Sequence, residues 1–278
     1  MKNQIYKPTS LARWLVNQHL IKSNFSPLPK LLAPSTATQA VDVQNTFIKI
    51  KSQQCGPIIG WKIALSTPSM QKMVGLDSPV AGRLHSRQVI KAPARTSIKE
   101  YGRLLIEFEI AVQISKNLPT ATTRHTALTV ASSVSAFAPA FELADDRNAD
   151  YSQLGGQGLQ MIADNAWNEG AILGEWIPIS KIWNQNNHIT NRDDSLGALR
   201  GEAFINNISV GNGFGRDLMG HPLNAIAWLA NEANDRGTLL KSGDIAILGS
   251  LVTSKFPGPG DTLRFELTGF NPITLKVD

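Results

Sequence analysis

Cysteine is almost absent from this chain, which contains Cys55 alone among its 278 residues. A single cysteine cannot form an intrachain disulfide, so the disulfide-stapled class of small secreted domains is excluded. Such sparse cysteine is typical of a reducing compartment, and we therefore expect a cytoplasmic protein. Its stability must come from a hydrophobic core, for which 278 residues with a hydrophobic fraction of 42% are sufficient.

Long hydrophobic runs are also missing from the sequence. No stretch approaches the roughly twenty consecutive apolar residues that a membrane-spanning helix requires. The opening segment, MKNQIYKPTSLARWLVNQHL, has no continuous apolar core of signal-peptide length. We therefore expect a soluble protein that carries neither a membrane span nor an export signal.

The excess of positive over negative charge is small. The formal net charge is +5, and the basic residues are spread without any Lys/Arg block. This distribution argues against nucleic-acid binding, whereas mild basicity suits an anionic metabolite. Two further motif classes are missing. No nucleophile elbow or Ser-His-Asp order appears, and the glycines at 211, 213 and 215 do not have dinucleotide-binding spacing.

The secondary-structure signals divide the chain near residue 56. Residues 10–54 show helical spacing of apolar side chains, interrupted by a proline-rich connector. Later helices are expected over 127–138 and after Pro222, and the polar stretch 183–200 is expected to be an exposed insertion.

Short apolar runs punctuated by Gly, Pro, Asn and Asp dominate the rest of the sequence. Many short strands with few helices predict an α+β protein containing a mixed β-sandwich or roll. We expect a helical N-terminal segment over residues 1–56, packed on a catalytic mixed β-roll domain over residues 57–278.

One predicted strand, LLIEFEIAVQI over 104–114, carries two carboxylates on an otherwise apolar background. Alternation places Glu107 and Glu109 on the same face, with their Cα atoms about 6.6 Å apart at normal strand rise. Buried and unpaired carboxylates would be too costly, so they need solvent, cations or a metal. A solvated sheet edge is the simplest interpretation of this strand taken alone.

A third acid favours a metal site. Glu142 lies in the apolar run APAFELADD, about thirty residues further on. Three carboxylates from neighbouring strands suit a hard divalent cation such as Mg²⁺ or Mn²⁺, and leave coordination positions for water or substrate. Neither His nor Cys accompanies these acids, which argues against zinc.

The ordered set GWK, GLDSP, EFE, FELAD, IADN, GHPLNAIAWLA and GDIAILGS resembles the 2-keto-4-pentenoate hydratase and 4-oxalocrotonate decarboxylase family of the fumarylacetoacetate hydrolase superfamily. The resemblance runs from about residue 10 to the C-terminus. It implies the β-roll of that superfamily's C-terminal domain, and it implies that Glu107, Glu109 and Glu142 bind Mg²⁺ or Mn²⁺. It also implies a homo-oligomer that acts on a small 2-oxo or 2-hydroxydienoic acid.

Two further residues acquire catalytic roles through this resemblance. Lys62, in GPIIGWKIALS, reads on its own as a lysine that extends from a strand edge into solvent. The family has a lysine at this place, which implies a cation near the metal that either pairs with a substrate carboxylate or moves protons after its pKa is lowered. Asp77, in VGLDSP, is an ordinary turn residue by composition, and the resemblance places it near the active site.

Other positions are expected to contact substrate. Asp164 and Asn165 match the family's ADN, although an Asx-type turn would also explain them. The chain departs from its relatives at Trp167, where they have a small residue, and at Leu248, where they have a threonine that Ser250 could replace. Val80 is a third departure. These positions are expected to line the substrate pocket, so the resemblance leaves the substrate open.

The resemblance implies a reaction in which a divalent metal stabilises the enolate of a 2-oxo acid. A hydratase, a decarboxylase and a C–C hydrolase of the superfamily all use such chemistry. The hydrolase branch has a loop bearing His and Glu after the strand of Lys62, and STPSMQKMVGLDSPVAGRL has neither. We therefore expect a hydratase, with a 2-oxo-acid decarboxylase, an acylpyruvate C–C hydrolase and a noncatalytic metal-dependent binder of acidic metabolites as alternatives.

Overall fold

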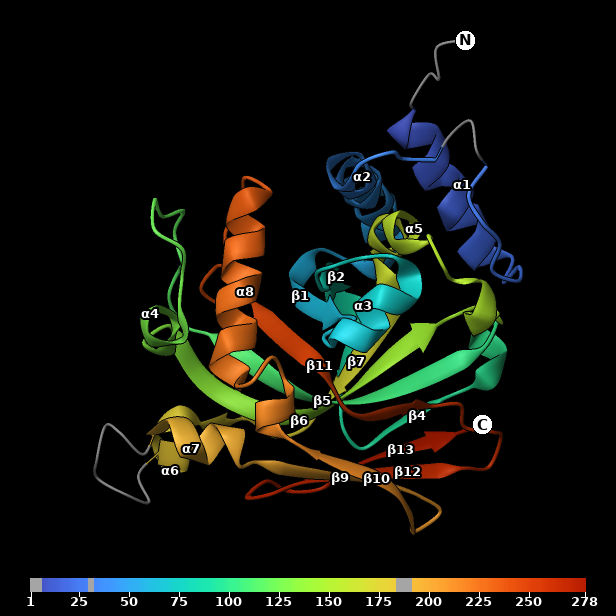
Figure 1. Cartoon of the computed structure of the whole chain (residues 1–278). Coiled ribbons are helices and arrows are strands. Elements are labelled where there is room, and N and C mark those ends of the chain that lie inside the picture. Colours follow the sequence, from blue (N-terminus) through green and yellow to red (C-terminus); the bar gives the residue numbers. More distant parts are fainter. Residues whose placement is uncertain (1–6, 30–32, 184–191) are drawn as a thin grey trace.

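The computed structural model describes residues 7–29, 33–183 and 192–278, and its strands form two sheets that lie one above the other (Figure 1). The larger sheet runs in the order β2-β1-β11-β5-β6-β7-β3, with β8 paired to β6. The smaller sheet runs β10-β9-β12-β13-β4. Most neighbours are antiparallel, but β1 with β11, β3 with β7 and β4 with β13 are parallel. This mixture confirms the predicted α+β class with a mixed β-roll.

The larger sheet consists of eight strands, whose bounds are β1 Ile58–Ala64, β2 Val80–His85, β3 Val89–Lys91, β5 Leu104–Ile114, β6 Val134–Asp145, β7 Asn168–Leu173, β8 Ile177–Pro178 and β11 Ile245–Lys255. The smaller sheet has five, which are β4 Ala94–Thr96, β9 Arg200–Ile205, β10 Ile208–Phe214, β12 Thr262–Leu267 and β13 Ile273–Val277.

The helices of the described residues are α1 Pro8–Leu20, α2 Ala37–Cys55, α3 Pro68–Val74, α4 Ala127–Ala131, α5 Gly158–Ala163, α6 Ile179–Trp183, α7 Arg192–Gly197 and α8 Pro222–Asp235. Local chemistry explains where several of them begin. The Thr36 and Thr67 hydroxyls cap α2 and α3 by accepting backbone N–H bonds, and Pro222 occupies the first turn of α8. None of these helices is long and apolar enough to cross a lipid bilayer.

Strand β5 separates two different environments, because its alternating side chains face opposite ways. Ile106, Phe108, Ile110 and Val112 belong to the core between the two sheets and α8. The rings of Phe108, Phe141 and Phe265 meet there at centroid separations of 5.5 to 6.4 Å. The opposite face of β5 presents its two glutamates away from this core.

The N-terminal helices cover the opposite side of the larger sheet. Figure 1 shows α1 and α2 beside α5, across the larger sheet from the smaller one. Leu11 and Leu15 of α1 and Phe47 of α2 are fully buried in a second core, which also contains residues of α5. Leu105, which shares a face of β5 with the two glutamates, belongs to the same core, so the helical segment packs on the side of the larger sheet that presents the glutamates.

Two local predictions differ from the structure. The helix expected over 127–138 ends at Ala131, and the chain continues as β6 from Val134 because its apolar residues pair with β5 along their whole length. The exposed insertion expected over 183–200 lies partly outside the described residues. Its last part forms α7, in which Leu196 is fully buried, so this part is not a surface insertion.

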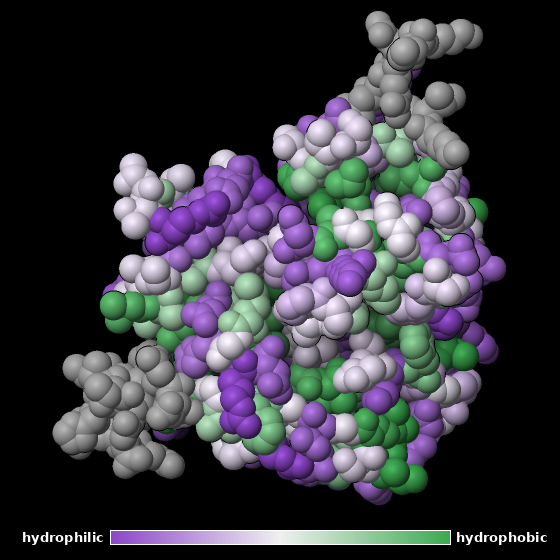
Figure 2. Space-filling model, in the orientation of Figure 1, coloured by the Kyte–Doolittle hydropathy of each residue, from purple (hydrophilic) through white to green (hydrophobic). Residues whose placement is uncertain are grey.

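The surface is chemically mixed. Figure 2 shows hydrophilic and hydrophobic residues interspersed on the visible face of the molecule. Among the described residues, the large hydrophobic side chains that are exposed are scattered over several elements: Leu20, Ile21, Ile90, Leu128, Ile208 and Phe256. Single exposed apolar residues of this kind are normal on soluble domains and need no special explanation.

Candidate active site

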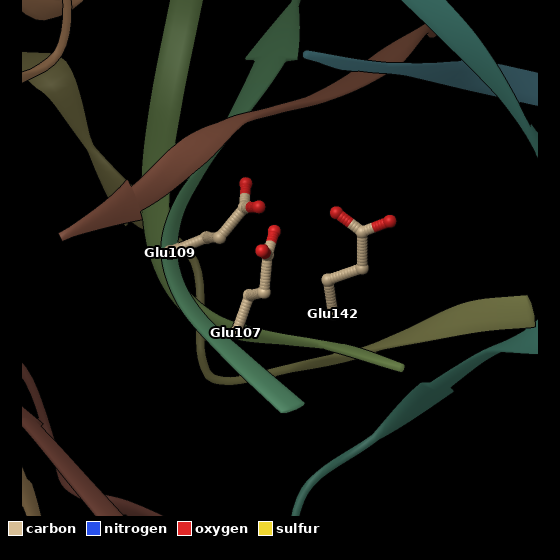
Figure 3. A group of neighbouring side chains, drawn as sticks. All are labelled: Glu107, Glu109 and Glu142. Atoms are coloured by element: carbon tan, nitrogen blue, oxygen red, sulfur yellow. The ribbon is translucent and has the colours of Figure 1, made fainter. Parts of the chain in front are cut away.

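Strands β5 and β6 bring the three predicted acids together. Glu107 and Glu142 lie directly opposite each other in the antiparallel register, and Glu109 follows two residues along the same face. One carboxylate oxygen from each residue lies within 4.8 Å of the other two. Figure 3 shows Glu107 and Glu109 side by side on one strand, with Glu142 facing them across a small space.

Burial makes this cluster electrostatically unfavourable without a cation. Glu109 and Glu142 are fully buried. Burial raises the pKa of Glu109 well above its ordinary value, and the charges of Glu142 and Glu107 raise it further. Within the described residues, Glu109 Oε1 and Glu142 Oε2 are buried without a hydrogen-bond partner. Free oxygens from three convergent carboxylates are the donor set that a hard divalent cation prefers, so these residues fit Mg²⁺ or Mn²⁺.

Hydrogen bonds fix the orientation of each carboxylate. The Asn168 side chain donates to Glu142 at 2.8 Å, and the Ser254 hydroxyl donates to Glu107 at 2.7 Å. Glu109 accepts the backbone N–H of Gly249 at 2.7 Å. Gly249 lies where the pairing of β11 with β5 shifts register, and this bulge turns its N–H toward the acid.

Lys62 supplies the positive charge of the site. It lies on β1, is 2% exposed, and its Nζ is 2.9 Å from Glu142 Oε1. Burial alone would lower the pKa of Lys62, but the carboxylates of Glu142, Glu107 and Glu109 outweigh burial and raise it. For Lys62 the sequence offered two alternatives. One was a lysine that extends from a strand edge into solvent, and the other was a proton-transferring cation with a lowered pKa. Neither holds in the structure, because three acids surround a buried ammonium group.

The loop between α5 and β7 forms the wall beside Lys62. Asn165, Ala166 and Trp167 have successive left-handed φ angles of 51°, 47° and 64°. The Asn165 side chain accepts from the backbone N–H of Arg83 at 2.7 Å and donates to its carbonyl at 3.0 Å, which ties the loop to β2. The Ala166 carbonyl lies 3.5 Å from Lys62 Nζ.

Asp164 points away from the acids and joins a second charged network. Its two oxygens lie 2.6 Å from His19 Nε2 and 2.7 Å from Arg147 Nη2. His19 Nδ1 lies 2.8 Å from Glu169, which also pairs with Lys51 at 2.7 Å. Asp164 is therefore positioned to hold the loop and α1 in place, and its predicted contact with substrate is not visible in this arrangement.

A cavity of about 280 Å³ opens on this site. Lys62 and Glu107 lie at its polar end, and Trp167 and Ala166 contribute to its wall. A neighbouring cavity of about 350 Å³ shares Glu107 and Ser254 with it and includes Ser250. Glu107 thus lies at the boundary of two partly open cavities that a small molecule can enter.

The remaining predicted residues have different surroundings. Leu248 is fully buried in the core between the sheets. The Ser250 hydroxyl accepts from the Phe108 N–H at 3.0 Å and donates to the Val252 carbonyl at 2.6 Å. Asp77 is exposed in the loop after α3 and does not line the cavity. Val80 is 1% exposed in the core beneath α1 and α2.

Several residues of the site were not identified from the sequence. Asn168 and Ser254 carry no recognisable pattern, and only the fold brings them to the acids. Gly249 could have been found, because an isolated glycine inside a strand often marks a bulge. Gly82 could not have been found from the sequence, because its role depends on contacts between distant segments. A Cβ at Gly82 would lie 2.9 Å from Lys62 Cγ and 3.0 Å from Asn165 Oδ1. His85 is also buried, at 1% exposure, and its Nε2 lies 3.2 Å from the Ile48 carbonyl.

Comparison with known proteins gives relatives along nearly the whole chain. A 2-keto-4-pentenoate hydratase of Burkholderia vietnamiensis is 26% identical over 226 residues, which cover 81% of this chain and 80% of that protein. The structure of 4-oxalocrotonate decarboxylase from Pseudomonas putida G7, complexed with magnesium and adipate, superimposes with a TM-score of 0.86 at 21% identity and covers 98% of this chain and 97% of its own. Fumarylpyruvate hydrolase from Pseudomonas aeruginosa, in complex with Mn²⁺ and pyruvate, gives a TM-score of 0.57 at 13% identity. That match covers 79% of this chain and 88% of the hydrolase chain.

The sequence model of the Fumarylacetoacetate (FAA) hydrolase C-terminal family matches residues 70–278. That range includes the three acids, the wall loop and both strands that carry the cluster. With its β-roll and its carboxylate triad, the chain belongs to the fumarylacetoacetate hydrolase family.

Proposed function

We propose that this protein is a metal-dependent hydro-lyase that adds water to a 2-hydroxydienoic acid of the 2-keto-4-pentenoate type. The observation that carries the proposal is the convergence of three carboxylates and one buried lysine, of which Glu107 and Lys62 line a cavity of about 280 Å³. The similarity to a 2-keto-4-pentenoate hydratase over 81% of the chain supports the choice of reaction.

Glu107, Glu109 and Glu142 would hold the divalent cation, which we propose to be Mg²⁺ or Mn²⁺. A solved relative is complexed with magnesium and another with Mn²⁺, so both ions remain candidates. When bound, the cation supplies Lewis-acid polarisation of the carboxylate and 2-oxo oxygens of a 2-oxo acid.

The protein's own residues then position the substrate and protonate it. Lys62 Nζ, already within hydrogen-bonding distance of Glu142, supplies a positive charge and N–H donors where negative charge develops on the substrate. Ala166 and Trp167 of the wall loop line the cavity and shield one side of it from bulk water. We propose that Ser250, Trp167 and Leu248 shape substrate binding directly or through the strand that carries them, that Asp164 and Asn165 fix the loop, and that Asp77 acts from its exposed loop.

The decisive experiment is Mg²⁺-dependent loss of the dienoate chromophore of 2-hydroxypenta-2,4-dienoate. The native protein should consume it with formation of the hydrated 2-oxo acid, and Glu107→Gln should lose this activity. Loss of activity on removal of Mg²⁺ with EDTA and recovery on its return would tie turnover to the metal. A native protein that shows ligand-induced thermal stabilisation without turnover would be a noncatalytic binder, and the proposal would be wrong.

A decarboxylase is the second candidate, because the decarboxylase from Pseudomonas putida G7 superimposes over 98% of this chain. Release of CO₂ from 4-oxalocrotonate, measured beside hydration of the pentadienoate, separates the two. The hydratase proposal requires the hydration to have the higher kcat/KM.

Assembly and location are also proposals. We propose a homo-oligomer in the cytoplasm, consistent with a single cysteine. Light scattering coupled to size exclusion measures the mass directly, and a mass equal to the 30.2 kDa chain would contradict the oligomer.

A further inference from the structure

The cavity beside the metal site has two chemically different ends. Its polar end consists of Lys62, Glu107, Ser254 and Thr253. The rest of the wall is apolar or aromatic: Ala64, Leu65, Met70, Met73, Val74, Leu105, Ala144, Tyr151, Leu154, Met161, Ala166, Trp167 and Phe256. A substrate that places its acid group at the metal would therefore direct its other end along this apolar wall.

Among residues 7–29, 33–183 and 192–278, no cationic side chain lies on that apolar wall to receive a second carboxylate. Lys62 is the single basic side chain among the described residues that line the cavity, and it pairs with Glu142 at the polar end. Arg103 reaches the wall only indirectly: its guanidinium lies 4.6 Å from the Phe256 ring and bonds Asp146. An ionised group in such surroundings would lose its hydration without a compensating partner.

The one phenol on the wall is also occupied. The Tyr151 hydroxyl lies 3.2 Å from Asp146 Oδ2, to which it donates, and its ring meets Trp167 and Phe256 edge-on at centroid distances of 6.3 and 6.5 Å. Asp146 places a negative charge behind this aromatic group, which further disfavours an anionic tail. Trp167 contributes a large apolar surface that a small residue would not.

We infer that the substrate is a 2-hydroxydienoic or 2-oxo monocarboxylic acid with an apolar extension, alkyl or aryl, beyond the reacting carbons, and that dicarboxylic acids are poor substrates. The inference rests on the proposed function, since it places the acid group at the metal. It identifies Trp167, Met73 and Met161 as residues that determine specificity.

Binding of unreactive ligands tests the inference separately from catalysis. With Mg²⁺ present, calorimetry would compare 2-oxobutanoate, 2-oxopentanoate, 2-oxoheptanoate and the dicarboxylate 2-oxohexanedioate. Each added methylene should tighten binding roughly threefold to fourfold. The dicarboxylate should bind about 100-fold more weakly than 2-oxoheptanoate, which has similar length. Equal or tighter binding of the dicarboxylate, or no gain with chain length, would overturn the inference.

The kinetic series uses 2-hydroxy-2,4-dienoates that carry methyl, propyl, phenyl or carboxylate at the far end. The expected order of kcat/KM is phenyl and propyl above methyl, with the carboxylate lowest. If none of these is turned over while the binding series keeps its order, the proposed reaction fails and the inference about the tail stands.

A charge placed on the wall should reverse the preference. Met73 lies on α3, is partly buried and lines the cavity, so Met73→Lys can place an ammonium group there. This variant should bind 2-oxohexanedioate at least tenfold tighter than the native protein and 2-oxoheptanoate more weakly. Leu128→Lys on α4, where the side chain is 85% exposed, is the matched control and should change neither. Unchanged Mg²⁺ affinity would show that Met73→Lys is folded. A folded Met73→Lys protein with native ligand preference would contradict the assignment of this wall.

Discussion

Four charged side chains meet at the centre of the site: Glu107, Glu109, Glu142 and Lys62. Three are acidic and one is basic, so the group carries excess negative charge if all are ionised. Burial magnifies this imbalance, because water cannot screen the charges. A divalent cation between the acids removes it. The arrangement is thus costly without metal and stable with it.

The role of Lys62 gives a first prediction. Lys62→Met should keep metal binding, since the three acids remain, but should lower kcat by about 10² or more, because the positive charge beside the substrate is lost. Mg²⁺ titration by calorimetry and steady-state hydration rates measure the two effects. Lys51→Met is the matched control: it removes a partly buried lysine that pairs with another acid, Glu169, and should retain native kcat. Native turnover in Lys62→Met would show that the assignment is wrong.

Gly82 gives a second prediction at the same scale. The side chain of Gly82→Ala would press on both Lys62 and Asn165. We expect a reduction of kcat of about tenfold, since an error of 1 Å in positioning can cost up to about 10²-fold, with little change in Mg²⁺ affinity. Gly155→Ala is the control, because nothing lies within 4 Å of its added methyl and its backbone is not left-handed. Equal kcat in the two variants would contradict a positioning role for Gly82.

At the scale of elements, helix α1 is held to the wall loop by charge. Burial would lower the pKa of His19, but Asp164 and then Glu169 raise it above its ordinary value of 6.5. The stabilisation from His19 is therefore complete below about pH 6.5 and is lost as the pH rises through the folded value. Burial would raise the pKa of Glu169, but Lys51 and His19 lower it, so its contribution is lost only on acidification below its ordinary 4.5.

This network predicts a specific pH dependence. His19→Gln should lower the free energy of unfolding at pH 6 by about 3 kcal/mol, because Asp164 and Glu169 lose a buried cationic partner. The difference from the native protein should shrink as the pH rises above 6.5 through the raised pKa of His19, because His19 then becomes neutral in the native protein. Urea denaturation at several pH values measures it. A difference independent of pH would mean that His19 contributes by packing alone, for example against the ring of Phe47.

Elements with strong local patterns were predicted from the sequence. The alternation over 104–114 gave strand β5 with its two acids on one face, and the helical spacing near the N-terminus gave α1 and α2. The prediction of a helix over the whole of 127–138 was wrong, because a buried strand and a short helix have similar apolar composition. Pairing with β5 along the whole of β6 decides between them, and that partner is not visible locally.

Long-range contacts set the limit of prediction for the site. The position of Glu142 in a second apolar run suggested a three-acid site, but only the resemblance to a known family assigned Glu142 to the same metal as the acids of β5, because no local signal specifies which strands pair. His19 and Asp164 are 145 residues apart in sequence, and nothing near either suggests the contact. The three left-handed residues at 165–167 were also unforeseen, since two of them, Ala166 and Trp167, rarely adopt that conformation. The metal-ligand role of the acids and the catalytic role of Asp77 stay predictions.

At the scale of the whole molecule, metal binding should be coupled to folding. Because unfolding separates β5 from β6, the unfolded chain lacks the site, and bound metal stabilises the native state by mass action. Mg²⁺ at 100 times its Kd should add about 2.7 kcal/mol to the free energy of unfolding, and EDTA should remove it. Thermal unfolding with and without metal measures this.

Glu109→Gln provides the control for that coupling. Its amide oxygen can still accept the Gly249 N–H, while the buried negative charge is gone. The variant should equal or exceed the stability of the metal-free native protein, but should gain nothing from Mg²⁺. A metal-induced shift as large as in the native protein would show that Glu109 is not a ligand.

The ion pairs that connect α1 to the loop before β7 also bear on protein engineering. A chimera that takes its first helix from one relative and its wall loop from another would separate His19 from Asp164 and Glu169 and leave charges unmatched in the interior. Residues 8–20 and 158–169 must therefore be exchanged together. Recombination libraries built from this fold should take these two distant segments from the same parent sequence.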